Sequence, residues 1–285
     1  MNPDDEIRPG QVREITAVSN PLIKQMRALS MKKVRDETGH FVAEGLKLVT
    51  DALDGEWPMH VVAYSKNNAG NAHLQSVAAK ARARGAMILE ASEKVLSAIT
   101  RRDNPQMAVG VFSQQWVKPA EIKPQQDQLW IALDRVRDPG NLGTIVRTAD
   151  AVGAAGVMLV GETTDPFSLE AVRATMGSIF HVPLTTMGEA EFLDWRKGWP
   201  GMVVGTHLEG AVDYRSVDYS QGPILLLMGN EQQGLPDSLA AACDHLCLIP
   251  MAGQADSLNL AVSTGIMAFE VRRHALAMPP REAGA

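Results

Sequence analysis

Short apolar runs in the second half of the chain constrain its fold more than any other feature. They are Leu129–Leu133, Val157–Val160, Met202–Gly205, Ile224–Met228 and His245–Ile249. Stretches with helical periodicity separate most of them, notably Leu142–Val152 and Leu260–Arg273. Short apolar strands that alternate with helices are typical of a parallel sheet covered on both faces. The sequence therefore predicts an α/β domain with its ligand-binding loops at the carboxyl ends of these strands.

The first part of the chain has a separate pattern of strands and helices. Strands are predicted at Phe41–Ala43, His60–Tyr64, Ala86–Leu89 and Met107–Phe112, and helices at Leu46–Leu53 and Leu74–Arg84. A short helical arm, Asn20–Arg35, is expected ahead of them. The polar stretch 114–127 contains Pro119, Pro124 and several glutamines, which indicates a linker. We therefore expect a small α/β domain over residues 1–113 and a second domain over residues 128–285.

Charge and cysteine content narrow the class of protein. The net charge is −6, but residues 1–126 carry a net charge of +3 and residues 127–285 a net charge of −9. This asymmetry fits a polyanion held mainly by the first domain. Only Cys243 and Cys247 are present, which favours a reducing compartment. Because no signal peptide or long apolar span is recognisable, a cytoplasmic protein without a membrane segment is expected.

Polar residues follow the first apolar run. Asp138-Pro139-Gly140-Asn141 leads into a helix that carries Arg147. Pro139 and Gly140 favour a turn, and Asn141 is suited to cap the helix. Arg147 is expected to point away from the apolar stripe of that helix. Taken alone, a capping asparagine and a solvated arginine explain these residues more simply than a functional site does.

A second polar loop follows Ile224–Met228. Gly229 would let a ligand approach the backbone closely, and Glu231 is placed where a carboxylate can face a substrate. The spacing from Gly229 to Gly234 lacks the Lys-Ser/Thr that completes a P-loop. By itself this loop is more simply explained as a turn with an exposed glutamate.

The third loop joins the last apolar run to the last long helix. Ser257 or Asn259 is expected to begin that helix. The start of a helix offers free N–H groups and a positive dipole end to a ligand. Capping residues are again the simpler explanation when the loop is considered alone.

Together the three loops resemble the motifs of the SpoU, or TrmH-like, family of RNA 2′-O-methyltransferases in the SPOUT class. The similar segments are Asn141-Leu142-Gly143-x-x-x-Arg147, Met228-Gly229-Asn230-Glu231-x-x-Gly234, and Ile249-Pro250-Met251 with Ser257-Leu258-Asn259. Their order and spacing match, and the likeness covers about residues 128–275. The segment from Asp165-Pro166 to Gly177-Ser178 resembles the middle segment of the family.

A second resemblance concerns the first domain. The stretch from Ile15 to Phe112 is similar to the L7Ae/L30e-like substrate-binding domain that often precedes the catalytic domain in this family. Its markers are Glu44-Gly45 and the alternation of strands and helices. These markers are less specific than the three loop motifs.

The family resemblance implies a fold and a cofactor. The fold is a parallel-sheet α/β trefoil-knot (SPOUT) domain preceded by a small α/β L30e-like domain, and the family works as a homodimer with each active site near the subunit interface. The cofactor is S-adenosylmethionine, bound in a bent shape by the second and third loops. The residues implied to hold it are Thr206, Gly229, Ile249, Met251 and Leu258. The chain has no GxGxxG fingerprint, which a Rossmann domain would be expected to carry.

The implied reaction moves the sulfonium methyl group to a ribose 2′-hydroxyl. Because the methyl group is already activated, the protein has to align the 2′-oxygen and help remove its proton. The catalytic residues implied by the resemblance are Asn141, Arg147, Glu231, Ser257 and Asn259. A guanidinium keeps its proton in proteins, so we expect Arg147 to orient the 2′-oxygen or a neighbouring phosphate and to stabilise negative charge. Proton removal is expected to be shared with the phosphate or water.

RNA is the expected partner. Ribosomal RNA is preferred because the first domain is similar to those of rRNA-modifying relatives, and tRNA is the alternative. Two basic runs are predicted to bind RNA, namely Lys24, Arg27, Lys32, Lys33 and Arg35, and then Arg101 and Arg102. Such runs are also typical of a solvated surface. If they bind phosphates, affinity should fall steeply with salt concentration.

Two other functions stay open. The chain could bind RNA without methylating it, although the intact Asn141, Arg147, Glu231 and Asn259 argue against that. It could also methylate a base, although the first motif favours ribose. Cys243-x-His245-x-Cys247 offers too few ligands on one predicted strand for zinc, so no metal site is predicted. Alternation along that strand would bury both cysteines on one face.

Overall fold

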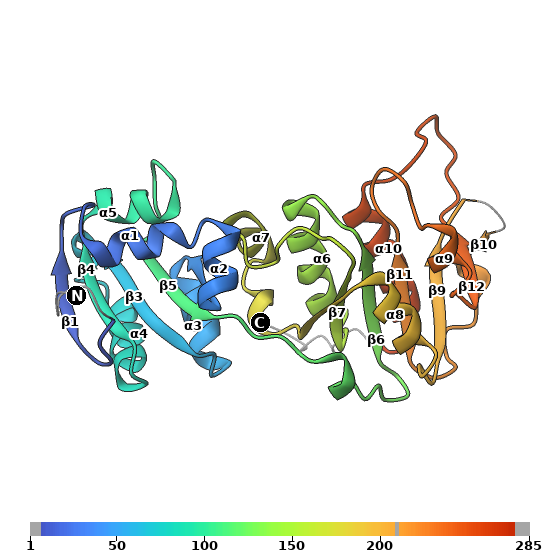
Figure 1. Cartoon of the computed structure of the whole chain (residues 1–285), viewed down its shortest axis with the longest axis horizontal. Coiled ribbons are helices and arrows are strands. Elements are labelled where there is room, and N and C mark those ends of the chain that lie inside the picture. Colours follow the sequence, from blue (N-terminus) through green and yellow to red (C-terminus); the bar gives the residue numbers. More distant parts are fainter. Residues whose placement is uncertain (1–6, 209–210, 277–285) are drawn as a thin grey trace, which may run out of the picture. The chain divides into compact units, whose positions relative to one another are not determined.

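The computed structural model describes residues 7–208 and 211–276 (Figure 1). The chain divides into two compact units. The first contains the residues up to Gln115 together with Asp165–His181, and the second contains Trp116–Thr164 and the residues from Val182 onward. The chain therefore leaves the second unit once and returns to it. None of the described helices combines the length and apolar character that a membrane span requires.

A mixed sheet organises the first unit, with strands in the order β1-β4-β3-β5-β2. The strands are β1 (Val12–Ile15), β2 (His40–Glu44), β3 (Met59–Ser65), β4 (Met87–Ala91) and β5 (Ala108–Ser113). β1, β4 and β3 are parallel, and β5 is antiparallel to both β3 and β2. β2 to β5 correspond to the four predicted strands, whereas β1 was not predicted.

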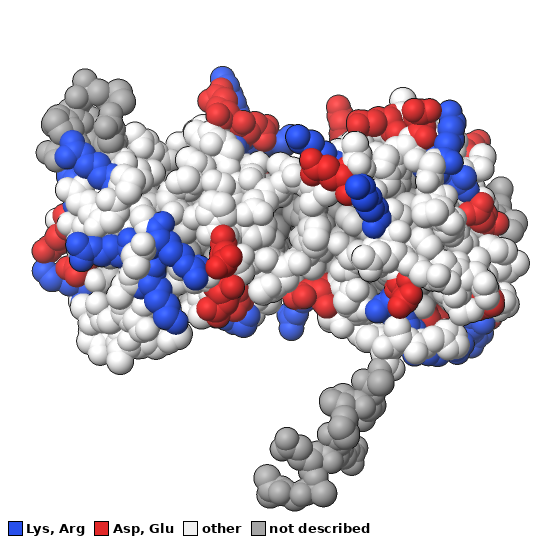
Figure 2. Space-filling view, turned by 90° about the horizontal axis from the view of Figure 1, so that it is seen from below, with Lys and Arg blue, Asp and Glu red and all other residues white. Residues whose placement is uncertain are grey.

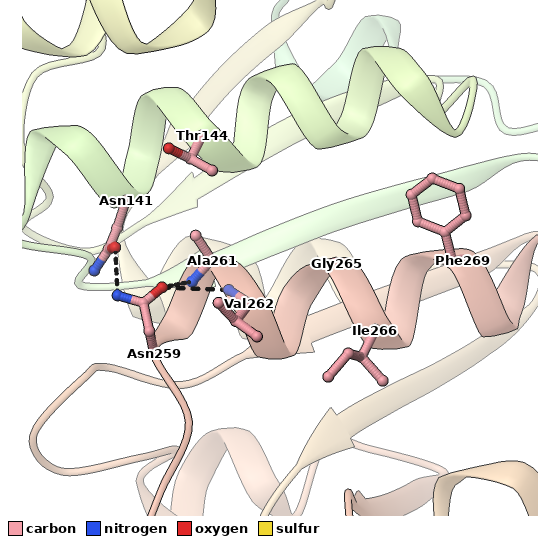
Figure 3. Close-up of a pocket in the computed structure, with 8 residues that line it drawn as sticks. All are labelled: Asn141, Thr144, Asn259, Ala261, Val262, Gly265, Ile266 and Phe269. Carbon is pink, nitrogen blue, oxygen red and sulfur yellow. Dashed lines mark hydrogen bonds between the residues drawn. The ribbon is translucent and has the colours of Figure 1, made fainter.

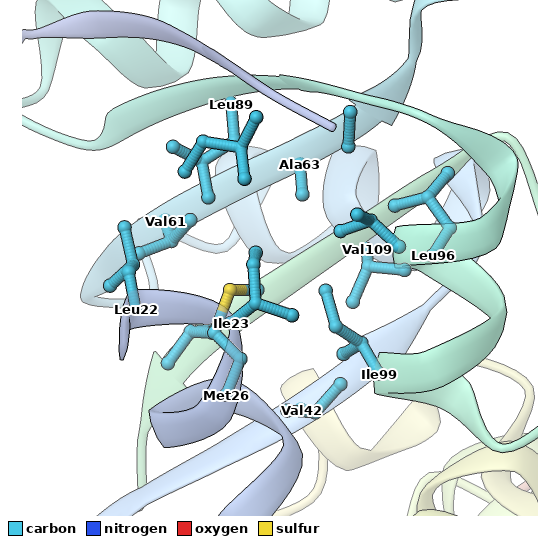
Figure 4. Close-up of a cluster of buried hydrophobic side chains, with 14 of the residues drawn as sticks. Leu22, Ile23, Met26, Val42, Val61, Ala63, Leu89, Leu96, Ile99 and Val109 are labelled. Carbon is cyan, nitrogen blue, oxygen red and sulfur yellow. The ribbon is translucent and has the colours of Figure 1, made fainter. Parts of the chain in front are cut away.

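Helices pack on this sheet. They are α1 (Pro21–Ala28), α2 (Lys32–Thr38), α3 (Leu46–Asp54), α4 (Ala72–Ala83), α5 (Glu93–Thr100) and α7 (Leu169–Thr175), with short 3-10 helices η2 (Lys66–Asn68) and η4 (Ser178–Phe180). The expected arm is two helices rather than one. Asn20 caps α1 by accepting a hydrogen bond from the Leu22 amide. Leu22 and Ile23 are fully buried among β-strand side chains (Figure 4), so α1 belongs to the core of the unit.

Asp165–His181 completes an aromatic cluster in the first unit. The Phe167 ring lies 4.8 Å from the ring of Phe41 on β2. The Phe180 ring lies 5.0 Å from Phe112 on β5 and 5.3 Å from Trp57. Phe41, Phe112 and Phe167 are among the largest fully buried side chains. Burial of these rings holds a segment that is more than fifty residues away in the chain against β2 and β5.

The second unit is built on a parallel seven-stranded sheet in the order β10-β12-β9-β11-β6-β7-β8. The strands are β6 (Leu129–Asp134), β7 (Gly156–Val160), β8 (Leu184–Met187), β9 (Met202–Thr206), β10 (Val212–Asp213), β11 (Ile224–Met228) and β12 (His245–Leu248). Every residue of β6, β7 and β11 is buried. These are central strands covered on both faces, which is why they read as continuous apolar runs in the sequence. The expected α/β fold with a parallel sheet is confirmed.

The helices of the second unit are α6 (Pro139–Ala151), α8 (Glu189–Arg196), α9 (Asp237–Ala240) and α10 (Leu260–Val271), with 3-10 helices η3 (Pro119–Glu121) and η5 (Tyr214–Ser216). α6 and α10 pack against each other. Trp130, Phe192 and Trp199 contribute to a buried cluster on the sheet. The expected linker also contacts this unit, because the Val117 amide donates to the Leu184 carbonyl at 2.8 Å.

The start of α6 differs from the prediction. Asp138, not Asn141, is the N-cap, and its carboxylate accepts a hydrogen bond from the Asn141 amide at 2.6 Å. Pro139 occupies the first turn, where a missing N–H costs nothing. The Asn141 side chain is therefore free to point elsewhere. For α10, Ser257 or Asn259 was expected to begin the helix, and the cap is Asn259, whose Oδ1 accepts from the amides of Ala261 and Val262.

Candidate active site

Three polar loops meet at the carboxyl edge of the parallel sheet. β6 and β11 are neighbouring parallel strands, with Met228 in register with Leu133. The loops that leave them, 135–138 and 229–236, therefore begin side by side. The third loop leaves β12 and ends at Asn259, where α10 starts against α6. Adjacent strand ends and two packed helices bring the three sequence motifs together.

A chain of hydrogen bonds joins one side chain from each loop. Asn259 Nδ2 donates to Asn141 Oδ1 at 2.8 Å (Figure 3). Asn141 Nδ2 in turn donates to Glu231 Oε1 at 3.3 Å. The same Glu231 oxygen accepts from the Asp138 amide at 3.5 Å. These residues, with Arg137 and Gln232, line a pocket of about 350 Å³.

The loop after β11 is folded tightly on itself. The Asn230 amide donates to the Gly234 carbonyl at 3.1 Å, and the Gly234 amide donates back at 2.9 Å. Asn230 Nδ2 donates to the Arg135 carbonyl at 2.7 Å and so ties this loop to the one after β6. A Cβ on Gly229 would lie 2.4 Å from backbone atoms of Gly234 and Leu235. Glycine is required at position 229 because the loop closes onto it. This structural reason is separate from the expected role of admitting a ligand.

Asp134 and Arg135 support the same edge of the sheet. Asp134 is fully buried, and its carboxylate accepts hydrogen bonds from Arg135 Nε and Nη2, the latter at 2.8 Å. This bonding raises the pKa of Arg135, whose guanidinium is paired with Asp134. Arg135 has a backbone φ of 44°, an uncommon value for a residue with a side chain. Neither residue was predicted from the sequence, although an acidic residue at the end of an apolar strand is a signal that could have indicated Asp134.

Arg147 lies on the exposed side of α6. Within the described part of the chain its side chain makes no hydrogen bond or ion pair, and it lines neither of the two pockets at Asn141. The structure therefore brings Asn141, Glu231 and Asn259 together but does not bring Arg147 into hydrogen-bonding contact with them. Ser257 is exposed in the loop that leads to Asn259.

The residues expected to hold the cofactor gather at three neighbouring strands. Thr206 ends β9, Gly229 follows β11 and Ile249 follows β12. These strands lie in the order β12-β9-β11. The Thr206 hydroxyl lies 3.9 Å from the Met228 sulfur. Backbone groups at these strand ends are suited to hold the polar parts of a nucleoside.

Two apolar side chains of the third loop are exposed to solvent. Met251 is 39% exposed and Leu258 is 37% exposed. Exposed apolar side chains beside convergent polar groups are suited to cover an adenine ring. The donor set and the apolar walls at this edge therefore fit an adenosyl cofactor.

A second pocket, of about 540 Å³, runs along α6 and α10 (Figure 3). Its lining residues are Asn141, Thr144, Asn259, Ala261, Val262, Gly265, Ile266 and Phe269. Val262 and Phe269 are 52% and 50% exposed. Their spacing of seven residues puts them on one stripe of α10. Asn259 lines this pocket and also the polar pocket, so the two pockets adjoin.

The basic residues predicted to bind RNA are in the first unit. On the face of the molecule that Figure 2 shows, Lys and Arg side chains lie interspersed with Asp and Glu side chains. Lys24 and Arg27 are exposed on α1, on the side away from the core. Lys32 and Lys33 are exposed and pair within α2 with Asp36 and Glu37 at 3.9 and 3.8 Å. Arg101 is exposed and directly follows α5.

Two arginines in these runs are occupied by ion pairs. Arg35 is 3% exposed, and its Nη2 lies 2.6 Å from Asp165 Oδ2. Its position does not fit the expectation of RNA contact, because the guanidinium is buried against that carboxylate. Arg102 is more open, with Nε 3.6 Å from the buried Glu44 carboxylate. Arg173 of α7 also pairs with Glu44, at 3.0 Å.

The two cysteines are free thiols. Cys247 is buried in β12, but Cys243 precedes that strand, so the expectation that both alternate along one strand is wrong for Cys243. Burial raises the pKa of Cys243 to about 12 and also raises that of Cys247. Among the residues that the structure describes, no group of three or more His, Cys, Asp or Glu side chains could hold a metal ion.

The fold and the site define a class of α/β protein with polar loops that converge at the carboxyl edge of a parallel sheet. Comparison with known proteins identifies the family. Residues 128–269 match the model of the SpoU rRNA methylase family, and residues 20–110 match the MRM3-like substrate-binding domain. The chain is 30% identical over 261 residues to the 23S rRNA (guanosine(2553)-2′-O)-methyltransferase RlmP of Bacillus subtilis, covering 92% of this chain and 100% of that protein. This chain belongs to the SpoU rRNA methylase family.

Two further relatives support the assignment. The 23S rRNA (uridine(2479)-2′-O)-methyltransferase of Streptomyces viridochromogenes is 31% identical over 275 residues, which cover 93% of this chain and 94% of that protein. The crystal structure of an AdoMet-bound rRNA methyltransferase from Sinorhizobium meliloti superposes with a TM-score of 0.88 at 57% identity, over 94% of this chain and all of that one. The predicted family and the predicted fold class are therefore confirmed.

Proposed function

We propose that this protein transfers a methyl group from S-adenosylmethionine to a ribose 2′-hydroxyl of ribosomal RNA. The observation that carries the proposal is the hydrogen-bonded chain Asn259–Asn141–Glu231, which joins the three family motifs at the carboxyl edge of the sheet. Relatives that align over nearly the whole chain are named as 23S rRNA 2′-O-methyltransferases, which favours rRNA over tRNA as the substrate.

The cofactor supplies an activated methyl group, so the protein's task is alignment and charge stabilisation. Thr206, Gly229 and Ile249 hold the adenosyl portion at the strand ends, and Met251 and Leu258 cover its apolar surface. This division fits the geometry, because backbone groups at the strand ends are polar while the two loop side chains are apolar and exposed.

The polar side chains act on the ribose. Asn141 and Asn259 each keep one amide N–H beyond the bonds already described, and these can hold the ribose oxygens. Glu231 keeps lone pairs that can accept the hydrogen bond of the 2′-hydroxyl. Arg147, whose guanidinium has no partner among the described residues, orients a phosphate or the 2′-oxygen and stabilises the negative charge that develops there. Ser257 adds a hydroxyl beside Asn259, and the proton leaves to the phosphate or water.

The assembly and the location of the protein complete the proposal. The apolar stripe of α10 that contains Val262 and Phe269 is covered by a second copy of the chain, which places each polar pocket beside a subunit interface. The C-terminal segment forms the trefoil knot of the family, supported by the packing of α10 against α6 and β11. A cytoplasmic location fits an rRNA substrate and two free thiols.

We assign residues 128–285 as the methyltransferase domain, residues 114–127 as the linker and residues 1–113 as the substrate-binding domain. Within the first of these ranges, Asp165–His181 packs in the first unit, and the linker from Trp116 onward packs in the second. Within the substrate-binding domain, Lys24, Arg27, Lys32 and Lys33 bind RNA phosphates from their exposed positions on α1 and α2, together with Arg101 and Arg102. Arg35 is left out of this set because it is buried.

Transfer of a labelled methyl group to a 23S rRNA transcript tests the proposal. The wild type should incorporate label as a 2′-O-methyl nucleotide, and Asn141→Ala and Arg147→Ala should lower the rate by about 100-fold or more, the usual loss when one donor to the transition state is removed. Binding of S-adenosylmethionine should be retained by Arg147→Ala.

Three outcomes would contradict the proposal. Label found in a base would indicate a base methyltransferase. RNA binding by the wild type without any transfer would indicate a non-catalytic relative. Full activity in both variants would remove Asn141 and Arg147 from the reaction.

A further inference from the structure

We propose that Arg137 binds a phosphate of the substrate RNA next to the ribose that is methylated. The inference rests on the proposed function and adds a substrate-binding residue that the three motifs do not include. Arg137 lies between the end of β6 and the N-cap of α6. Its side chain lines the pocket of about 350 Å³ together with Asn141, Glu231 and Asn259.

The carboxylates of this pocket are bonded to other groups. Asp138 caps α6 through the Asn141 amide at 2.6 Å. Glu231 accepts from the Asp138 amide and from Asn141 Nδ2. Arg137 is exposed, and its side chain makes no hydrogen bond or ion pair with any described residue. The pocket therefore presents a cation whose neighbouring carboxylates do not neutralise it by direct contact.

Arg137 differs in this respect from most arginines of the second unit. Within the described ranges, Arg135, Arg196, Arg215 and Arg273 pair with carboxylates, and Arg272 donates to the Val152 carbonyl. Within the same ranges, Arg137 and Arg147 are the two arginines of this unit whose guanidinium groups make no hydrogen bond or ion pair. They flank Asn141 in the chain, four residues before it and six residues after it.

The chemistry of an open guanidinium indicates the ligand. Its planar set of N–H donors matches the oxygens of a phosphate and can form two parallel hydrogen bonds. An RNA strand that places one ribose at Asn141 carries a phosphate on each side of that ribose. The cofactor carboxylate is the competing anion, but the residues that fit the cofactor come from β9, β11 and β12, whereas Arg137 follows β6. The position of Arg137 therefore favours RNA.

Comparison of the wild-type protein with Arg137→Gln tests the inference. The variant should bind a 23S rRNA transcript about fivefold more weakly and raise the KM for that RNA by a similar factor, as expected for one exposed ion pair. The slope of log K against log salt should fall by about 0.7 to 0.9, the contribution of one phosphate contact. The Kd for S-adenosylmethionine should be unchanged. Arg137→Lys should restore part of the affinity and most of the salt slope.

Lys197→Gln is the matched control for the loss of one positive charge. Lys197 is exposed, pairs with Asp194 at 3.0 Å and follows α8, before the amino end of β9. It therefore lies at the edge of the sheet opposite to the pocket, and its loss should leave RNA affinity, salt slope and KM at wild-type values.

The outcomes separate this inference from the proposed function. An Arg137→Gln protein with wild-type KM and salt slope, in an assay where the wild type methylates RNA, would overturn the inference alone. So would a weakened Kd for S-adenosylmethionine with unchanged RNA binding. RNA binding that depends on Arg137 in a protein without methyl transfer would support the inference and overturn the proposed function. A wild type that neither binds nor methylates the RNA would overturn both.

Discussion

Individual arginines in this protein have different roles that depend on the carboxylates around them. Arg35 is buried against Asp165, and a second bond runs from its Nη1 to the Leu29 carbonyl. Arg137 is exposed in a pocket whose carboxylates are bonded elsewhere. A charged side chain is stable in the interior only when its charge and its N–H groups are paired. The contrast separates a structural arginine from one available to RNA.

The Arg35–Asp165 pair leads to a prediction about stability. Asp165→Asn should lower the free energy of unfolding of the first unit by about 3 kcal/mol, because it leaves a buried guanidinium without its counter-charge. Denaturation in urea, followed by the fluorescence of Trp57 in the same unit, measures this change. Glu37→Gln removes the exposed Lys33–Glu37 pair and should cost less than 1 kcal/mol. Equal losses in the two variants would show that burial of the ion pair does not matter.

Hydrogen bonds fix the shape of the loop between β11 and α9. Asn230 and Gly234 exchange backbone hydrogen bonds, and Asn230 Nδ2 holds the neighbouring loop through the Arg135 carbonyl. Glu231 directly follows Asn230 in this loop and accepts a hydrogen bond from Asn141. The geometry of the loop therefore sets the position of a proposed catalytic carboxylate.

Gly229 tests this coupling. Gly229→Ala should weaken binding of S-adenosylmethionine by about tenfold or more and lower the rate of transfer, because the added methyl group would displace the backbone at Gly234 and Leu235. Calorimetric titration with the cofactor measures the effect. Gly70→Ala adds a methyl group where no atom lies within 4 Å and should leave both quantities unchanged. Wild-type cofactor affinity in Gly229→Ala would show that the loop tolerates the displacement.

The sequence predicted some elements and missed others for physical reasons. β6, β7 and β11 were predicted because both of their faces are buried, so they are apolar throughout. β10 is two residues long and β8 has an exposed residue, so neither forms a strong apolar run. α7 is short, and most of its contacts depend on a distant strand, β2, which periodicity cannot reveal.

At the scale of the whole molecule, the exposed stripe on α10 predicts the oligomeric state. Phe269→Glu should convert a dimer to a monomer, because it places a charge in an apolar interface, and methyl transfer should fall with it. Sedimentation velocity measures the change in mass. Met31→Glu, at an apolar residue of similar exposure in the first unit, should leave the dimer intact. A wild-type protein that sediments as a monomer would refute the proposed dimer.

The sequence by itself determined the parallel sheet, the three loop motifs and the family, because these depend on local periodicity and on residues close together in the chain. Only the tertiary structure decided that Asn141 is released from capping by Asp138, that Arg35 is buried with Asp165, and that Arg137 is left open beside Glu231. Each of these depends on a partner supplied by the fold. The residue type fixes the charge of a side chain. Whether that charge is neutralised depends on which distant groups the fold brings near it.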